Sequence, residues 1–199
     1  MGDGTTKGKI METMYHLVAE KGYDKASIGQ ISEAIGIKKA SVYYYFKSKE
    51  DIFLQMARVL YKDDYRDREA ILESDISADG YQVLLVETGE AFIDSYFENP
   101  DLRKVYAEID LQTTRIAALK EMIDRSDERF NRFMMKCMLR GIEVGAFPKD
   151  FDAKLNAEIL YAILIGIDQA ILYDLPIEPK AVWRESVSRL FERKALPQV

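Results

Sequence analysis

The sequence predicts an all-α protein with about nine helices, arranged as a small N-terminal domain and a larger helical C-terminal domain. Apolar residues recur at the spacing of three and four that places them on one face of a helix, and no useful stretch alternates as a strand does. N-capping residues, glycines and prolines interrupt this pattern at lengths typical of helices. The 199 residues are 48% hydrophobic, which is enough to form a core.

The first two helices are predicted on either side of a short loop. Residues 5–20 place apolar side chains on one face and are followed by a Lys-Gly-Tyr stop. Ser27 is a good N-cap for a second, shorter helix over residues 28–35. Gly36 should end that helix, because glycine readily adopts the left-handed conformation of a helix terminus.

A third short helix should begin near Lys39 or Ala40, with Val42 and Phe46 on its buried face. Two short helices joined by a tight glycine turn are the parts of a helix-turn-helix. The window from Gly36 to Lys49 contains four lysines, three tyrosines and no carboxylate. A basic and aromatic window at this place indicates a surface that meets phosphates.

The rest of the chain is also predicted to be helical. Turn-forming residues separate the segments at 74–80, 98–100, 145–148 and 174–176. Ser48 is a plausible N-cap for the first of these helices, and Pro100 can occupy the first turn of another. The predicted helices cover Ser48 to about Leu72, residues 81–97, a helix from Pro100, and residues 114–144, 152–173 and 179–194.

Charge is divided unevenly between the two predicted domains, residues 1–50 and residues 51–199. The whole chain carries −6, the first fifty residues carry +2, and the remainder therefore carries −8. A basic N-terminal end on an acidic body would present one end to DNA. The alternative is that both are ordinary solvated surfaces.

At the helix-turn-helix the chain resembles the TetR family of transcriptional repressors. The positions that match the family motif are Ser27, Ile31, Ser32, Gly36, Ile37, Ser41, Val42, Tyr43, Phe46, Ser48, Lys49, Glu50 and Phe53. Ser27 replaces the usual Thr and Ser32 the usual Ala, and both changes are mild. The resemblance implies a three-helix DNA-binding domain, followed by a domain that binds a ligand and dimerises.

Candidate DNA contacts follow from the motif and its exposed positions. Lys47, Lys49 and Ser27 suit phosphate, and the resemblance implies a phosphate contact for Tyr43. Residues on the exposed side of the third helix can contact base edges, where lysine donates to guanine and alanine touches a thymine methyl. Any single tyrosine could instead serve packing. The candidate residues are Ser27, Lys38, Lys39, Ala40, Ser41, Tyr43, Tyr44, Tyr45, Lys47 and Lys49.

Residues 159–173 are apolar around nearly the whole helix, so we expect this helix to be covered on two sides. It is too short to span a membrane and contains Asp168. The resemblance implies a homodimer formed by the last two helices, which would bind a palindromic operator in double-stranded DNA. A purely intrachain core is the alternative. The candidate interface residues are Tyr161, Leu164, Ile165, Asp168, Leu172, Trp183, Val187, Leu190 and Phe191.

The C-terminal domain contains enough aromatic and methionine side chains to line an adaptable pocket for a small-molecule effector, for which a lipophilic compound is favoured. Acidic residues on one helix would favour a lipophilic cation. The alternatives are a methionine-rich core and carboxylates that face water. The candidate residues are Tyr65, Glu90, Phe92, Asp94, Tyr96, Tyr106, Phe130, Phe133, Met134 and Met138.

Other classes of protein find little support in the sequence. One histidine, His16, and one cysteine, Cys137, indicate neither a metal cluster nor a Cys-His pair, and no nucleotide-binding loop occurs. We therefore expect no cofactor and no enzymatic activity. Without a disulfide framework or a signal-peptide pattern, a cytoplasmic protein is expected. The remaining alternatives are a helical adaptor that binds protein and, less favoured, an enzyme on a helical scaffold.

Overall fold

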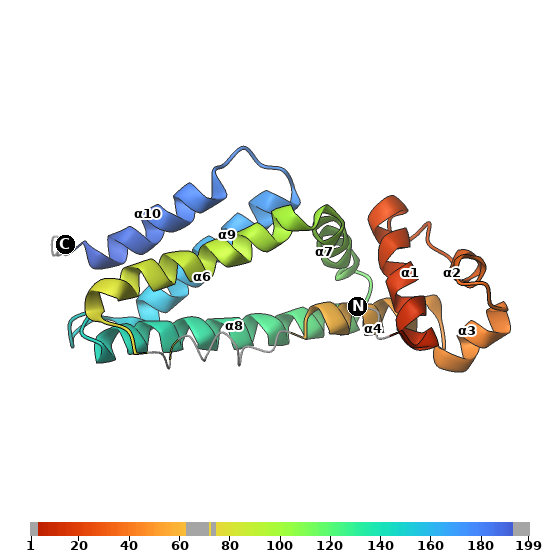
Figure 1. Ribbon diagram of the computed structural model, residues 1–199, viewed down its shortest axis with the longest axis horizontal. Helices are drawn as coiled ribbons and strands as arrows, with labels where there is room; N and C mark the ends of the chain where they lie inside the picture. The colour runs from red at the N-terminus through yellow and green to blue at the C-terminus, as the bar shows by residue number, and fades with distance from the viewer. Residues whose placement is uncertain (1–3, 63–71, 73–74, 193–199) are drawn as a thin grey trace. The chain divides into compact units, whose positions relative to one another are not determined.

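The computed structural model describes residues 4–62, 72 and 75–192, and nine helices with bounds lie within these ranges (Figure 1). No strand occurs among the described residues, which confirms the all-α prediction. The helices are α1 (Thr6–Lys21), α2 (Ile28–Ala34), α3 (Lys39–Tyr45), α4 (Lys49–Leu60), α6 (Ala78–Glu98), α7 (Pro100–Gln112), α8 (Ala117–Glu143), α9 (Ala153–Leu172) and α10 (Pro179–Phe191).

The chain forms two compact units. The first comprises Met1–Asp63 and Asn99–Ser126, and the second comprises Asp64–Glu98 and Asp127–Val199. Helices α4 and α7 therefore belong to the same unit as the three N-terminal helices. The predicted functional division at residue 50 concerns DNA binding and ligand binding, and it stays a prediction.

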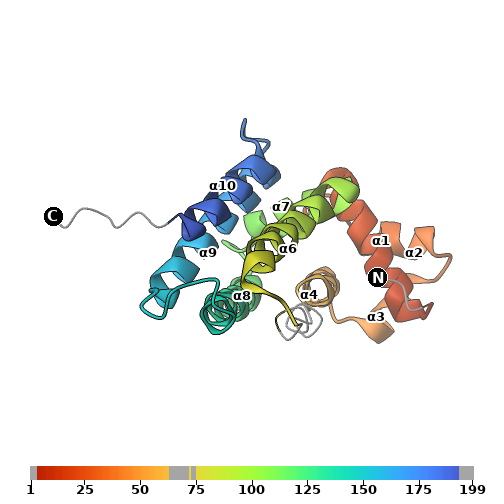
Figure 2. The same ribbon diagram turned by 60° about the vertical axis from the view of Figure 1, so that its left-hand side comes forward.

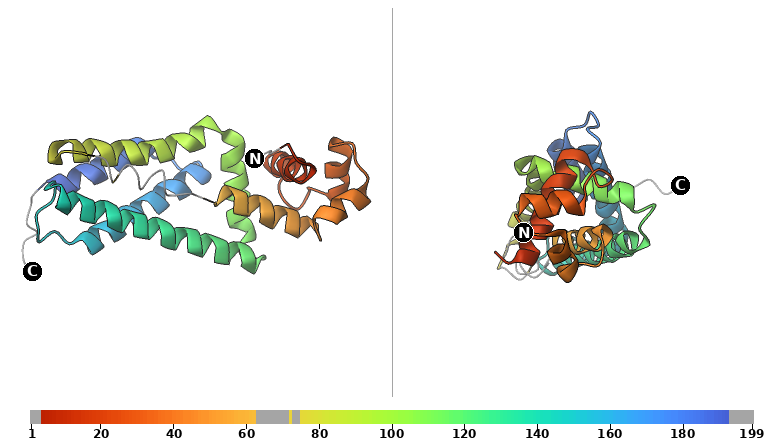
Figure 3. Two further views of the ribbon diagram at one scale, coloured as in Figure 1. Left: turned by 60° about the horizontal axis from the view of Figure 1, so that its bottom comes forward. Right: turned by 90° about the vertical axis from the view of Figure 1, so that its right-hand side faces the viewer.

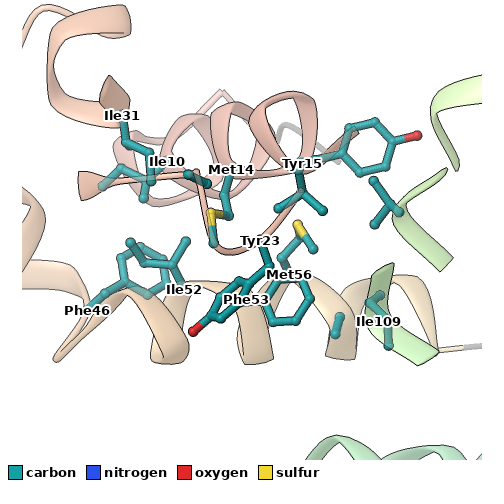
Figure 4. Packing of buried hydrophobic residues seen from close by; sticks show 14 of the residues in the cluster. Ile10, Met14, Tyr15, Tyr23, Ile31, Phe46, Ile52, Phe53, Met56 and Ile109 are labelled. Atoms are coloured by element: carbon teal, nitrogen blue, oxygen red, sulfur yellow. The ribbon is translucent and has the colours of Figure 1, made fainter. Parts of the chain in front are cut away.

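In the first unit, α1 packs against α2, α4 and α7 (Figure 3). Apolar side chains from these helices and from the end of α3 converge on one core, and Figure 4 shows residues of α1 facing residues of α4. The Tyr23 ring lies against Phe53 with 4.5 Å between ring centroids. Burial of this core holds the short α2 and α3 in place, since helices of seven residues are not stable alone.

Polar side chains define the helix ends of the first unit. Thr5 accepts a hydrogen bond from the amide of Gly8 at 3.0 Å, and Ser48 accepts one from the amide of Asp51 at 3.0 Å. Asn99 caps α7 through the amide of Leu102, and Pro100 occupies the first turn as expected. Each cap satisfies an amide that the helix itself leaves without a partner.

In the second unit, α10 lies along α6 and α9 (Figures 1 and 2). Trp183 of α10 fills a notch at Gly89 of α6, where an added Cβ would lie 2.1 Å from the indole. The indole Nε1 donates to the carbonyls of Leu85 and Val86 at 3.3 and 3.1 Å. The absence of a side chain at Gly89 therefore allows the two helices to approach closely.

One helix of the second unit, α6, begins earlier than predicted. The break predicted over residues 74–80 is wrong at its end, because α6 begins at Ala78. Ser77 accepts a hydrogen bond from the amide of Gly80 at 3.2 Å, which is the N-cap pattern, so Gly80 lies inside the first turn. The proposed continuation of α4 toward Leu72 and the end of the predicted last helix fall largely outside the described residues.

Helix α9 is the most apolar helix of the described chain. Its 20 residues and mean hydropathy of 1.5 would suffice, by length and composition, to cross a membrane. Seven of its residues, including Leu160, Leu164 and Ile167, are buried within the protein itself. Asp168 on the same helix accepts a hydrogen bond from Tyr96 of α6. This pattern is that of a core helix.

Candidate DNA-binding interface and effector cavity

The turn between α2 and α3 has the geometry of a helix-turn-helix. Ser27 and Gln30 form a reciprocal capping box, in which the Ser27 hydroxyl accepts from the Gln30 amide and the Gln30 side chain accepts from the Ser27 amide. Gly36 has a φ of 70°, in the left-handed region that glycine adopts without strain. The amide of Ile37 then donates to the carbonyl of Ser32 at 2.9 Å, which closes the turn.

Helix α3 has one buried face and one exposed face. Val42 and Phe46 are 0% and 1% exposed, so they attach this helix to the core of the first unit. On the opposite face Tyr44 is 83% exposed, and Ala40, one turn earlier, is exposed as well. The rings of Tyr44 and Tyr45 lie edge to face, with 5.0 Å between centroids. This face of α3 is therefore exposed to solvent.

The lysines near this face of α3 differ in where their side chains lie. Lys38 and Lys47 are exposed at the two ends of α3. The side chain of Lys39 instead lies back across α2, where its Cε is 3.1 Å from the position of a Cβ at Gly29. Gly29 thus leaves room for the lysine stem, and the ammonium group stays near the start of α2.

Lys49 is tied to the protein. Its ammonium group donates to the carbonyls of Tyr23 and Asp24 at 3.0 and 3.3 Å and lies 4.1 Å from the centroid of the Tyr23 ring. Burial of Tyr23, followed by the nearby Glu50 and Asp24 carboxylates, raises the pKa of its phenol. The structure therefore gives Lys49 an internal role between the loop after α1 and the start of α4.

Asp51 lies in the first turn of α4, next to the predicted phosphate contacts Lys47 and Lys49. Its carboxylate accepts from the side chain of Gln55 and from the backbone amide of Lys47, both at 2.8 Å. These two hydrogen bonds, the Gln55 bond first, lower the pKa of Asp51. The Lys47 amide is consequently engaged, while the Lys47 side chain remains exposed for an anion.

All the predicted DNA contacts lie in the described part of the first unit, and most of them are exposed. Ser41 is half-buried, and Ser27 uses its hydroxyl in the capping box. Tyr43 and Tyr45 are 56% and 38% exposed, so both side chains present surface to solvent. The assignment of individual contacts stays a prediction.

A small cavity lies in the second unit between α6, α8, α9 and α10. Four of the predicted pocket residues line it, namely Phe92, Phe130, Phe133 and Met134. The sequence interpretation missed the other lining residues, which are Leu85, Thr88, Gly89, Cys137, Leu164 and Trp183. Helical spacing could have indicated these α6 residues, because Thr88 and Gly89 lie one turn before Phe92 and Leu85 lies two turns before it on the same helix.

The acidic residues predicted for the pocket are engaged elsewhere. Glu90 forms an ion pair with Arg184, and Asp94 forms one with Lys180 at 2.6 Å between nitrogen and oxygen. Tyr96 donates to Asp168.

The remaining pocket candidates lie apart from the cavity lining. Tyr106 belongs to the first unit, where its hydroxyl lies 3.4 Å from the Leu60 carbonyl oxygen. Met138 is fully buried in α8, and Tyr65 lies outside the described residues.

The predicted interface residues fall into two groups. Leu164, Trp183 and Val187 are at most 3% exposed within a single chain, so their side chains pack internally and offer almost no surface to a second copy. Ile165 is 40% exposed. The others are half-buried, namely Tyr161, Asp168, Leu172, Leu190 and Phe191.

An apolar stripe on α9 was only partly predicted. Leu155, Ile159 and Ile165 are 52%, 44% and 40% exposed, and Ala162 and Gly166 lie along the same side. The spacing of three and four places these residues on one face. Around Gly166 an added Cβ would meet no atom within 4 Å, so this part of the helix surface is open.

The architecture defines a class of protein: helical, with a helix-turn-helix at the N-terminus and a cavity in a separate helical unit. Residues 10–56 match the family model of bacterial regulatory proteins, tetR family. The matched segment contains the helix-turn-helix, so this part of the chain is similar in sequence to the DNA-binding region of TetR-family transcription regulators.

Sequence relatives match about a quarter of the chain. The biofilm operon icaADBC HTH-type negative transcriptional regulator IcaR of Staphylococcus epidermidis is 45% identical over 47 residues, which are 24% of this chain and 25% of that protein. The match thus spans about a quarter of the length of the relative. The likeness therefore concerns a limited part of each chain.

Solved structures are similar over nearly the whole chain. A TetR transcription regulator from Haloarcula marismortui has a TM-score of 0.74 at 23% identity, over 94% of this chain and 96% of the other. A transcriptional regulator from Saccharomonospora viridis in complex with choline has a TM-score of 0.71 at 24% identity, over 94% and 95%. At this identity the likeness concerns the fold.

Proposed function

We propose that the protein is a transcriptional repressor that binds a palindromic operator as a homodimer and is released by a small molecule. The observation that carries the DNA-binding part is the exposed face of α3, with Ala40 and Tyr44 at its centre and exposed lysines at both ends. This combination suits a recognition helix, because residues toward its N-terminal end can contact base edges and exposed lysines at its ends can contact bases or phosphates.

The dimer is supported by the apolar stripe of α9. Three exposed isoleucine and leucine residues on one helix face are unusual unless a partner covers them. A second copy related by two-fold symmetry would cover the same stripe on both chains. Two helix-turn-helix units held in this way would read two half-sites, which is why we expect a palindrome.

The effector part rests on the cavity of the second unit, and the Saccharomonospora viridis regulator in complex with choline supports small-molecule binding without indicating the class of ligand here. In this scheme the ligand favours a state of the dimer that holds DNA weakly. By linkage, the DNA-bound dimer must then bind the ligand more weakly by the same factor. We place the protein in the cytoplasm, where it would meet its operator.

The test is a binding titration with DNA from the promoter region of the protein's own gene, repeated over a range of salt concentrations. Lys47→Ala should weaken binding to all sequences and lower the slope of log affinity against log salt by about 0.9. Lys38→Ala should weaken binding and relax the preference at one base position. Lys149→Ala, which removes an exposed lysine from the second unit, is the control and should change neither quantity.

Failure to bind any palindrome at low salt would contradict the repressor and favour the protein-binding adaptor. Equal effects of Lys47→Ala and Lys149→Ala would show that only general charge matters. If a ligand raises the melting temperature of the dimer and leaves the operator affinity unchanged, that result would contradict release by the ligand. It would not contradict DNA recognition.

A further inference from the structure

We propose that the cavity between α6, α8, α9 and α10 binds an uncharged apolar small molecule against the indole of Trp183. This inference deepens the proposed function, on which it rests, by assigning the chemical class of the effector. It also reverses the expectation of a lipophilic cation that the acidic residues of α6 suggest at the level of sequence.

The polar atoms around the cavity are already hydrogen-bonded within the protein. The Thr88 hydroxyl donates to the Leu84 carbonyl at 2.7 Å, and the Trp183 Nε1 donates to two carbonyls of α6. Burial raises the pKa of the Cys137 thiol to about 12, so this group stays neutral at physiological pH. Among the residues that line the cavity, none carries a formal charge.

Three carboxylates of α6 lie close in sequence to the cavity lining. Glu87 is exposed, and helical spacing places it on the side of α6 away from the lining, whereas Glu90 and Asp94 pair with α10. Glu90 pairs with Arg184, and Asp94 pairs with Lys180 at 2.6 Å. The basic residues of these ion pairs, Lys180 and Arg184, stand on either side of Trp183 in α10. The contacts that hold α10 against α6 therefore also balance the charges of Glu90 and Asp94. A cationic ligand would lose water without meeting a free carboxylate here, and an anionic ligand would meet no cation of the lining.

The cavity must widen around its ligand. Its volume is about 20 Å³, which is little more than the roughly 10 to 15 Å³ that one water needs. Met134 supplies a flexible wall, because the unbranched side chain has several rotatable bonds. Phe92 and Phe130 are only partly buried, with nearly parallel rings 6.2 Å apart, and can part to admit an apolar group.

Trp183 makes the test direct, because it is the only tryptophan of the chain. Its fluorescence would be followed in the intact protein during titration with octanol, octanoate and octyltrimethylammonium, which share one alkyl chain and differ in charge. Octanol should produce a saturable change. The two ions should need concentrations at least about tenfold higher, because each would bury an unpaired charge.

Three variants locate the binding site. Cys137→Val adds volume to the cavity wall and should weaken octanol binding by about tenfold or more, whereas Met134→Ala enlarges the cavity and should tighten it. Met135→Ala, a neighbour on α8 outside the lining, is the matched control and should leave binding unchanged. Helical content by circular dichroism identifies a variant that fails to fold, and tighter binding by Met134→Ala cannot result from misfolding.

An absent response to octanol, tighter binding of either ion, or equal effects of the Met134 and Met135 substitutions would overturn the inference. The DNA titration is carried out separately and without ligand. If the protein binds its operator but does not respond to octanol, the proposed class of effector is wrong and the proposed DNA-binding function stands. If the protein binds octanol saturably but does not bind an operator, the proposed DNA-binding function is wrong and the proposed binding site in the cavity stands.

Discussion

Lys47 and Lys49 show how two lysines of one motif serve different purposes. Both are plausible phosphate contacts by position, since they flank the Ser48 cap. The structure leaves the Lys47 side chain exposed, while the Lys49 ammonium group binds carbonyls more than twenty residues earlier in the chain. Local spacing predicts exposure, but it cannot predict a hydrogen bond to a distant loop.

Substitution by glutamine should separate the two roles. Lys49→Gln should lower the free energy of unfolding by about 1 to 2 kcal/mol, because it removes charge-assisted hydrogen bonds to two carbonyls. Lys47→Gln should leave that free energy nearly unchanged and reduce the salt dependence of DNA binding. Urea unfolding and the DNA titration measure the two effects. Loss of stability in Lys47→Gln and unchanged stability in Lys49→Gln would contradict the proposed roles.

The pH dependence of stability should report on Asp51. Because its pKa is lower in the folded state, its contribution is fully present above the unfolded pKa of about 4 and is lost as the pH falls through the folded value. Asp51→Asn should therefore be less stable than the unmodified protein near neutral pH, and the difference should shrink below about pH 4.

Urea unfolding at several pH values measures this difference. Glu50→Gln, at an exposed acid in the same helical turn, is the control and should show a smaller change. A difference for Asp51→Asn that grows as the pH falls would have the wrong sign and would contradict the assignment.

At the scale of elements, the packing of α10 on α6 decides much of the second unit. Helical spacing correctly predicts that Trp183 and Val187 share an apolar face. It does not identify the neighbour, and the structure buries both residues within the chain. The notch that receives the indole depends on Gly89, and although helical spacing places Gly89 one turn before Phe92, it does not indicate which side chain fills the space.

Gly89→Ala should test this packing. A methyl group there would lie 2.1 Å from the indole, so α10 must shift, at a cost of about 1 to 3 kcal/mol of unfolding free energy. Val83→Ala, at a residue of α6 that is 56% exposed, is the control and should change the free energy of unfolding by less than about 0.5 kcal/mol. Thermal unfolding followed by Trp183 fluorescence measures both, and a neutral Gly89→Ala would refute the notch.

Most helix starts were predictable because a particular residue marks each of them. Ser27, Ser48 and Pro100 are such markers, and the structure uses all three. The start of α6 was missed because Gly80 resembles a breaker, although it lies within the first turn after Ser77. The cavity was less predictable, since its walls come from four helices and its lining depends on how they pack.

At the scale of the molecule, the DNA-binding surface and the exposed stripe of α9 lie in different compact units. The motif that carries recognition is compact in sequence, which is why it could be assigned without a structure. A partner for the exposed stripe of α9 would come from a second chain. The dimer is therefore proposed from the exposure and the spacing of the apolar residues on this helix. The charge of +2 in the first fifty residues and −8 in the rest is consistent with DNA meeting the N-terminal end.

A charge placed on the α9 stripe should separate the dimer. Ile159→Glu introduces a carboxylate on a side chain that is 44% exposed in the single chain, so the protomer should fold while the interface loses its apolar match. Val83→Glu, at a residue of α6 that is 56% exposed, is the matched control and should remain dimeric. Sedimentation measures the mass, and a dimeric Ile159→Glu would place the interface elsewhere.

The central claim is that this chain reads DNA as a two-fold pair of recognition helices. Selection of bound sequences from a random pool of duplex DNA by the purified protein tests it most directly. The account predicts enrichment of one palindrome with two equal half-sites, and loss of that enrichment when Ala40 and Tyr44 on the exposed face of α3 are replaced. Absence of any enriched sequence, or enrichment of a single asymmetric site unaffected by those replacements, would contradict it.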